Sequence, residues 1–386
     1  MIYTELLEKQ ILDRLQIDNP WWKAGHIPDF FAKMTPRLYL DIFMSLVEAT
    51  DLSRAVILMG PRRVGKTVMM FHAIQRLISQ GVPARNIIYI SVETPIYNKI
   101  LLETLLNLSC KVLETDIRNN QFFVFFDEIQ YLKDWEVNLK SLVDTYRNVK
   151  FVASGSAAAE LKKRSNESGA GRFTDFNLPP LTFYEYIHLK GRSDIMRPGY
   201  IDWHDRQTLV YETDKLTVLN NRRTDDTARN YQRETQFKIY LTNPSLRCAL
   251  FQPIDANDEK MGDMVETAVF AQWIPRQNLS ISYANWRTGR SEQGEVDIVG
   301  VNVAKQKPEW AVEIKWTDRF FDRPNELDSL RNFLEKNKMD SAIVTSISKQ
   351  GRIETNWGIL QFLPVSCYAY TVGANTVKQA RDSVGL

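Results

Sequence analysis

The chain has 386 residues, which is enough for two or three domains with an ample core. Its 49 basic and 47 acidic residues leave a formal net charge of +2, so no global field favours nucleic acid or an anionic membrane. The three cysteines, Cys110, Cys248 and Cys367, are odd in number and widely spaced, which favours a reducing compartment over a disulfide or zinc framework. Since no 18 apolar residues run together, we expect a cytoplasmic protein with no membrane association.

The first 50 residues predict a helical lead-in. Apolar residues at positions 6, 7, 11, 12 and 15 share one face of a helix. Residues 19–22, with the sequence NPWW, predict a turn, and a second helix is expected over 38–49.

Short apolar strands then alternate with amphipathic helices as far as residue 190. Strands are expected at 55–59, 87–92, 122–126 and 149–154, with helices at 66–79, 97–113 and 135–146. Such alternation implies right-handed crossovers and a parallel sheet that is buried on both faces. The fold class is therefore α/β, with one domain over residues 51–190.

The composition changes after Pro179 and Pro180. Residues 191–236 are polar and predict a linker or a small helical module. A second apolar pattern begins at residue 237 with FKIYL, and its expected elements are strands at 296–303, 310–316 and 342–345 and helices at 262–273 and 325–337. We expect a second, smaller α/β domain over residues 237–386.

Residues 60–67 read GPRRVGKT, a complete G-x-x-x-x-G-K-[ST] phosphate-binding loop (Walker A) directly after the first predicted strand. Glycines at both ends let backbone N–H groups face a phosphate, Lys66 can reach the β- and γ-phosphates, and the Thr67 hydroxyl can ligate Mg²⁺. The alternative is a chance match in a glycine-containing turn, which the strand-loop-helix context disfavours. Nucleotide contacts are predicted for Gly60, Pro61, Arg62, Arg63, Val64, Gly65, Lys66, Thr67 and Val68.

A buried apolar strand at residues 122–126 leads into Asp127 and Glu128. In a Walker B element the first carboxylate orients Mg²⁺ and its waters, and the second activates the attacking water. The alternative is an ordinary acidic turn after a strand. Because the pair follows a phosphate-binding loop, the sequence predicts Asp127 as a metal ligand and Glu128 as a catalytic residue.

Polar groups after the next strand complete the predicted site. Ser154 and Ser156 are candidates to orient the lytic water or to sense the γ-phosphate, although serine after a strand is often a turn or helix cap. Arg172, in the segment GAGRF, suits a charge supplied to the γ-phosphate of a neighbouring subunit. A solvated surface arginine is the alternative.

The order of these motifs resembles the prokaryotic AAA-type ATPases of the AAA_14 and DUF4143 architecture. The resemblance is carried by GPRRVGKT, FDEIQYL, the Ser-Gly-Ser strand end, and GRF followed by LPPLTFYEY, and NPWW fits one branch of the family. It covers about residues 10–190 and 237–316. The resemblance implies an AAA-like P-loop fold and ATP and Mg²⁺ as cofactors, with Lys66, Thr67, Asp127 and Glu128 at the nucleotide.

A second candidate centre lies in the C-terminal region, where residues 294–298 read GEVDI and residues 313–315 read EIK. Asp297 and Glu313 would hold Mg²⁺, Lys315 would position or activate water, and Glu266 would add a carboxylate. An ion pair on a strand edge is the alternative. The segment also resembles the PD-(D/E)xK restriction-endonuclease-like fold of the DUF4143 region.

The chain departs from the family where relatives carry a winged-helix-like module, because only about fifty residues separate Tyr186 from Phe237. We expect that module to be truncated. Three functions stay open: an ATPase coupled to a nuclease-like domain, a metal-dependent nuclease regulated by nucleotide, and a nucleotide-gated scaffold with little catalysis. Candidate partners are a second copy of the chain, a nucleic acid or a protein.

Overall fold

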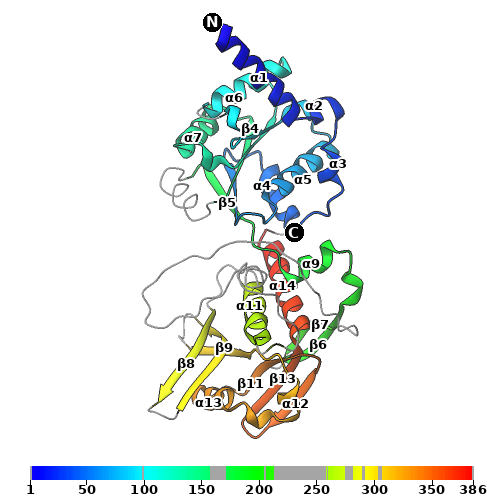
Figure 1. The fold of residues 1–386 in the computed structure, drawn as a ribbon, viewed down its shortest axis with the longest axis vertical. Coiled ribbons are helices and arrows are strands. Elements are labelled where there is room, and N and C mark those ends of the chain that lie inside the picture. Colours follow the sequence, from blue (N-terminus) through cyan, green and yellow to red (C-terminus); the bar gives the residue numbers. More distant parts are fainter. Residues whose placement is uncertain are drawn as a thin grey trace. The chain divides into compact units, whose positions relative to one another are not determined.

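The computed structural model describes residues 2–97, 100–156, 171–203, 206–212, 258, 260–273, 281–288, 292–302 and 307–384. The chain divides into two compact units, one formed by residues 1–179 with 379–386 and the other by residues 180–378 (Figure 1). Over the described ranges, we find no helix with the length and apolar character needed to span a bilayer. The apolar segment that begins at residue 237 and Cys248 lie outside the described residues.

The first unit is built on a five-stranded sheet in which all strands are parallel. In sheet order the strands are β2 (Ile87–Ser91), β3 (Phe122–Asp127), β4 (Val149–Gly155), β1 (Ala55–Met59) and β5 (Phe173–Asn177). The parallel α/β architecture and four of these strands confirm the prediction. Strand β5 has no apolar run, because only one of its five residues is buried, and the sequence pattern misses it.

Between β1 and β4, where all but two residues are described, the strands are connected by α5 (Lys66–Ser79), α6 (Leu102–Leu113) and α7 (Trp135–Thr145). Along the strand order of the sheet, the connection from β1 to β2 runs in one direction, and the connections from β2 to β3 and from β3 to β4 run in the opposite direction. Right-handed crossovers therefore place α5 on one face and α6 and α7 on the other, as Figure 1 shows. Helix α6 begins later than expected because Pro95–Tyr97 forms a separate 3-10 turn.

The lead-in of the first unit is helical, as predicted. Its helices are α1 (Ile2–Asp18), α2 (Trp21–Ala24), α3 (Asp29–Ala32) and α4 (Leu40–Glu48). The predicted turn at 19–22 is shorter than expected, because Trp21 already begins α2. Helix α1 packs against α6 and β2, and α3 and α4 pack against α5.

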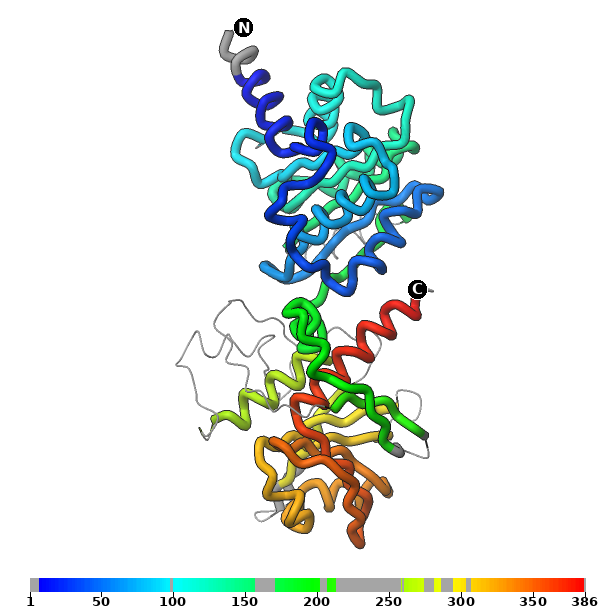
Figure 2. Tube along the Cα trace, turned by 90° about the vertical axis from the view of Figure 1, so that its right-hand side faces the viewer, coloured from blue at the N-terminus to red at the C-terminus, as the bar shows by residue number. Residues whose placement is uncertain are grey.

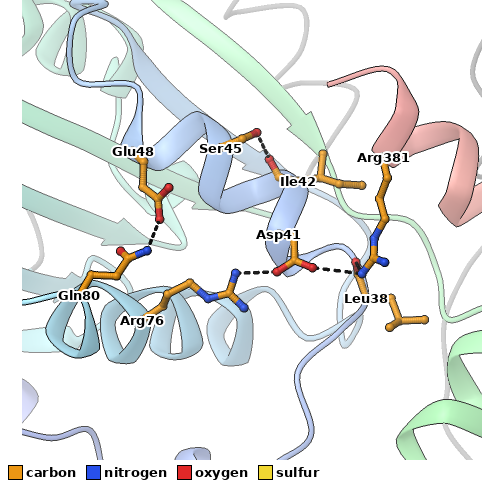
Figure 3. Close-up of polar contacts among 8 residues, drawn as sticks. All are labelled: Leu38, Asp41, Ile42, Ser45, Glu48, Arg76, Gln80 and Arg381. Carbon is orange, nitrogen blue, oxygen red and sulfur yellow. Dashed lines mark hydrogen bonds and ion pairs between the residues drawn. The ribbon is translucent and has the colours of Figure 1, made fainter. Parts of the chain in front are cut away.

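The end of the chain belongs to the first unit. Arg381, in the last turn of α14 (Val365–Asp382), donates to Leu38 O at 3.4 Å and to Asp41 Oδ2 at 3.1 Å. Arg76 of α5 donates to the other oxygen of the same carboxylate at 2.6 Å (Figure 3). Asp41 therefore joins α4, α5 and the end of α14 through one carboxylate.

The second unit contains a six-stranded mixed sheet. Its strands, in sheet order, are β12 (Gly351–Thr355), β13 (Gly358–Pro364), β11 (Ser341–Ser346), β10 (Lys307–Glu313), β9 (Glu292–Asn302) and β8 (Ile281–Thr288). Strand β11 runs parallel to both neighbours, and the other pairs are antiparallel. Helix α14 continues directly from β13, as the red segment of Figure 2 shows.

The two larger apolar clusters among the described residues of the second unit pack helices against its sheet. One contains residues of α11 (Met261–Trp273) and α14, such as Val269 and Tyr368, packed with Ile298. The other contains residues of α13 (Asp328–Asn337), such as Leu330, packed with Val299. The expected helices near 262 and 325 and the expected strands near 296, 310 and 342 are therefore present, although β10 ends at Glu313, three residues early.

Residues 191–236, predicted as a linker or a helical module, contain a strand pair in the described part, after a 3-10 turn at Ser193–Ile195. Strands β6 (Arg197–Trp203) and β7 (Arg206–Glu212) form an antiparallel hairpin. Ile201 and Val210 of this hairpin are buried in the core with α11 and α14, so it is part of the second unit. The boundary between the units lies at residue 180, ahead of the expected residue 190.

One buried lysine in the first unit gives a test of the fold. Lys150 on β4 is 4% exposed, and its Nζ donates to Ala49 O at 2.7 Å. Burial lowers the pKa of Lys150 to about 8, and the nearby Asp51 only partly opposes this change. In the unfolded chain the same ammonium keeps its proton to about pH 10.

The unfolded state therefore binds more protons than the folded state between these pKa values, and this lysine makes stability rise with pH there. We expect the free energy of unfolding of the wild type, minus that of Lys150→Met, to increase by about 2 kcal/mol from pH 8 to pH 10. Denaturant titrations of both full-length proteins measure the difference. Lys140→Met, which changes an exposed lysine, is the control, and a flat difference for Lys150→Met would contradict the assignment.

Candidate nucleotide site

Two glycines shape the loop between β1 and α5. A Cβ on Gly60 would lie 2.5 Å from the carbonyl oxygen of Leu178, so no side chain fits there. Gly65 has φ +93°, a left-handed conformation that favours glycine, immediately before the first residue of α5. The loop therefore ends with its backbone at a helix N-terminus, the place where backbone N–H groups and the helix dipole favour an anion.

Arg37 holds the loop from outside the motif. Its Nη1 donates to Val64 O at 2.8 Å and its Nη2 donates to Pro179 O at 3.1 Å. The guanidinium is largely buried and links the loop to the residues that follow β5. No local motif marks Arg37, because its partners lie 27 and 142 residues away in the sequence.

Lys66 is folded back onto the loop. Its Nζ donates to Gly60 O at 3.1 Å, Pro61 O at 3.0 Å and Ser156 Oγ at 3.0 Å. Burial lowers the pKa of Lys66, and the carboxylates of Glu128 and Asp127 oppose this change. All three partners are neutral oxygens, so an anionic phosphate would be a stronger acceptor for the same ammonium.

The carboxylate of Asp127 is almost fully buried at the end of β3 and accepts hydrogen bonds on both oxygens. Thr67 Oγ1 and Tyr89 Oη each donate to Oδ2 at 2.8 Å, and Ser154 Oγ donates to Oδ1. The Thr67 hydroxyl and the Asp127 carboxylate are hard oxygen donors, which is the ligand type that Mg²⁺ prefers. The side chains of Thr67 and Asp127 are therefore of the kind that binds the predicted Mg²⁺.

Tyr89 belongs to this site although the sequence does not mark it. Burial and the adjacent Asp127 raise the pKa of the Tyr89 hydroxyl far above its ordinary value, so it stays a hydrogen-bond donor. The residue lies inside the apolar strand β2, where an aromatic side chain is usual. Only the pairing of β2 with β3 brings its hydroxyl to Asp127.

Glu128 has φ +51° and ψ 49°, a left-handed conformation that is uncommon for a residue with a side chain. Ser156 Oγ lies 2.9 Å from both of its carboxylate oxygens, and Gln130 Nε2 donates to one of them. Its backbone N–H donates to Ser154 Oγ at 3.1 Å. Strained backbone of this kind persists where the surroundings hold it, and it is frequent at functional sites.

The structure thus brings together most of the predicted nucleotide-site residues. Pro61, Arg62 and Arg63 form the loop itself, and Val68 lies in the first turn of α5. Besides Arg37 and Tyr89, sequence reasoning missed Glu93, a carboxyl group whose pKa is raised by desolvation and by the charges of Glu128 and Asp127.

Arg172 lies elsewhere in the same unit. It directly precedes β5, whose first residue pairs with the first residue of β1, whereas the phosphate-binding loop follows the last residue of β1. Its guanidinium forms an ion pair with Asp144 of α7. Within one chain Arg172 is therefore remote from the loop, and a role in a neighbouring subunit stays a prediction.

The second unit holds an acidic cluster made by Glu266 of α11 and by Glu295 and Asp297 of β9. One carboxylate oxygen from each residue lies within 4.8 Å of those of the other two. Between Val296 and Val299, β9 carries one residue more than β8 opposite, a β-bulge that includes Asp297. Bulges redirect side chains, and here Asp297 comes to lie beside a helix residue.

Glu313 and Lys315 lie next to this cluster. Lys315 Nζ pairs with Glu313 Oε1 at 2.6 Å, while Glu313 Oε2 is buried without a hydrogen-bond partner. Burial and Asp297 raise the pKa of Glu313 to about 7. Burial alone would lower the pKa of Lys315, but the charges of Glu313, Asp297 and Glu266 raise it.

The second centre therefore differs in part from its prediction. Glu266 and Asp297 come together as expected, but Glu295 replaces Glu313 in the closest group of described carboxylates. Lys315 follows the end of β10, and its ammonium forms with Glu313 the ion pair that was the alternative to a metal site. The alternation of side chains along β9 is the signal that could have identified Glu295, since it lies two residues before Asp297.

Sequence comparisons with known proteins give matches to part of this chain. Residues 52–187 match a protein-family model described as "AAA domain". Two uncharacterized proteins of Methanocaldococcus jannaschii are 28% and 29% identical over 162 and 185 residues, covering 41% and 48% of this chain and 33% and 36% of theirs. An uncharacterized protein of Haemophilus influenzae is 26% identical over 152 residues, 39% of this chain and 37% of its own. These matches span about a third of each relative's length.

Solved structures are similar over less than half of this chain. The structure of C. elegans PCH-2 has a TM-score of 0.30 and 19% identity, covering 39% of this chain and 44% of its own. The S. cerevisiae Hsp104:casein complex has a TM-score of 0.31 and 18% identity, covering 42% of this chain and 30% of its own.

The loop geometry and the family match concern the same part of the chain. Lys66, Thr67 and Asp127 all lie inside the matched residues 52–187 and meet at the carboxyl ends of β1 and β3. Residues 52–187 thus form an AAA domain, which places this part of the chain in the AAA-type P-loop ATPase family.

Proposed function

We propose that the first unit binds ATP with Mg²⁺ and hydrolyses it. The observation that carries this proposal is a single hydrogen-bonded cluster in which the loop lysine, the Thr67 hydroxyl and both acids of the Walker B pair are connected. These groups come from the carboxyl ends of β1, β3 and β4 and from the start of α5. Ligands bind at that edge in open parallel α/β sheets.

Each residue has a role that follows from its contacts. Lys66 would exchange Gly60 O and Pro61 O for phosphate oxygens, and Thr67 and Asp127 would hold Mg²⁺. The metal ion supplies neutralisation of the phosphate charge. Glu128 would then orient the attacking water. Its carboxylate is already held by Ser156, a residue that also contacts the lysine.

Ser154 acts in this proposal as a positioning residue rather than a catalytic one. It is fully buried, and its hydroxyl is bonded to the carboxylate of Asp127 and to the backbone N–H of Glu128. One hydroxyl therefore fixes the relative orientation of the two acids. Arg172 is retained as a residue that would act on the nucleotide of a neighbouring copy of the chain.

Replacement of the loop lysine tests nucleotide binding. We expect Lys66→Ala to weaken ATP binding roughly 100-fold, because hydrogen bonds between charged groups contribute about 3 kcal/mol. Titration with a fluorescent ATP analogue measures the affinity. The exposed-lysine variant Lys140→Ala is the control, and equal affinities for wild type and Lys66→Ala would contradict the assignment of the loop.

Replacement of the second acid separates binding from turnover. We expect Glu128→Gln to keep nucleotide affinity and to lose ATP turnover on the order of 100-fold, because the amide cannot act as a general base. A matched control is Glu114→Gln, since Glu114 is an exposed glutamate with a similar φ of +49° at the end of α6. If the wild type turns over no faster than Glu128→Gln, the protein is a nucleotide-gated scaffold instead of an ATPase.

A second function is proposed for the second unit, namely a divalent-metal centre of the restriction-endonuclease-like type that cleaves nucleic acid. The specific support is the group of three close carboxylates together with the buried, unpartnered Oε2 of Glu313. Close carboxylates repel one another unless protons or a cation neutralise them. The adjacent Lys315 would assist the attack of water on a phosphodiester, as the family resemblance implies.

Removal of one carboxylate tests this centre. We expect Asp297→Asn to lose Mn²⁺ binding, measured by calorimetry on the full chain without nucleotide, and to lose metal-dependent cleavage of DNA and RNA substrates. The exposed-acid variant Glu335→Gln is the control and should behave as the wild type. Cleavage that is unchanged in Asp297→Asn would exclude this centre as its source, and metal binding without cleavage would leave a metal site only.

A further inference from the structure

The edge of the first sheet is closed by side chains from the lead-in. Among the described strands, β2 has the sheet neighbour β3 on one side and none on the other, so the polar backbone groups along its outer edge need other partners. Asn19 supplies two of them. Its Oδ1 accepts from Tyr89 N at 2.6 Å and its Nδ2 donates to Tyr89 O at 2.8 Å. A single carboxamide thus pairs with one residue of β2 as a neighbouring strand would.

The two following tryptophans extend this contact. Trp21 Nε1 and Trp22 Nε1 both donate to Ile87 O, at 3.0 and 2.7 Å. The ring of Trp21 also packs edge-on against the ring of Tyr89, with centroids 6.4 Å apart. The segment 19–22 therefore holds both the backbone and the aromatic ring of Tyr89.

The other end of Tyr89 reaches the metal ligand. Tyr89 is paired with Phe125, while Asp127 is paired with Ser91, so the hydroxyl spans two residues along the strands, about 7 Å. That is the length of a tyrosine side chain, and a serine or threonine at the same position would fall short. The hydroxyl donates to Asp127 Oδ2, the same oxygen that accepts from Thr67.

We infer that Tyr89 is a positioning residue for the metal ligand Asp127, and that Asn19 of the lead-in acts on the nucleotide site through it. This inference rests on the proposed binding of ATP with Mg²⁺. Two donors on Oδ2 fix the plane of the carboxylate, and only one of them, Thr67, belongs to the phosphate-binding motif. The segment ahead of the AAA domain thereby sets how well the site accepts the metal.

The test measures the affinity for a non-hydrolysable ATP analogue with Mg²⁺ and with chelator. The ratio of these two affinities is the quantity compared between variants, and it can be measured without turnover. We expect Tyr89→Phe to reduce the ratio about tenfold, which corresponds to one hydrogen bond to a charged group, and to leave the affinity in the presence of chelator unchanged. Tyr97→Phe is the matched control, because that buried hydroxyl donates to the carboxylate of Asp18 at 2.9 Å. It should lower thermal stability without changing the ratio.

The role of Asn19 is tested by a double-mutant cycle. Asn19→Ala alone should reduce the ratio, and in the Tyr89→Phe background it should cause no further reduction, because it acts through the missing hydroxyl. A ratio in Tyr89→Phe equal to that of the wild type, or additive effects of the two changes, would overturn the inference while leaving the ATPase proposal intact. A wild type whose affinity does not depend on Mg²⁺ would overturn both.

Discussion

The nucleotide site depends on one physical constraint, which is the burial of the Asp127 carboxylate. An ionised carboxylate inside a protein is stable only if hydrogen bonds replace its hydration. Its partners are Thr67 from α5, Tyr89 from β2 and Ser154 from β4. Strand β3 lies between β2 and β4, so this sheet order is what allows hydroxyl groups from both sides to reach the same carboxylate.

Hydrogen bonds connect Asp127 to the other polar residues of the nucleotide site. Ser154 links Asp127 to the backbone of Glu128, and Ser156 links the Glu128 carboxylate to Lys66. The site is therefore a continuous network, in which a change at one member is transmitted to the others. The left-handed backbone at Glu128 is stabilised by this network, which explains how an uncommon conformation persists at the end of a strand.

The second unit presents a different electrostatic arrangement. Around Asp127 the partners are neutral hydroxyl groups, whereas around Asp297 they include other carboxylates, with the ammonium of Lys315 nearby. Burial, followed by the charge of Asp297, raises the pKa of Glu313. A cation or a proton relieves such repulsion, and this is the physical reason for proposing a metal centre there.

The sequence by itself determined the local elements of the first unit. Apolar runs of four to six residues, separated by amphipathic helices, fixed a parallel α/β sheet, and the glycines, Lys66 and Thr67 of the loop were readable because their roles depend on neighbours in the chain. The same was true of Asp127 and Glu128, which follow a buried strand. Strand β5 escaped the pattern because only one of its five residues is buried, and the hairpin β6–β7 escaped it because its buried apolar residues, such as Ile201 and Val210, stand among polar ones.

Only the tertiary structure decided which distant residues complete each site. Tyr89 and Asn19 are 70 residues apart and meet because one closes the edge of the strand that carries the other. Arg37 meets the loop in the same non-local way, and Glu295 and Asp297 of β9 meet Glu266 because helix α11 places that residue beside them. Strand order, register and helix packing determine such contacts, whereas periodicity along a single chain indicates only which residues of one element share a face.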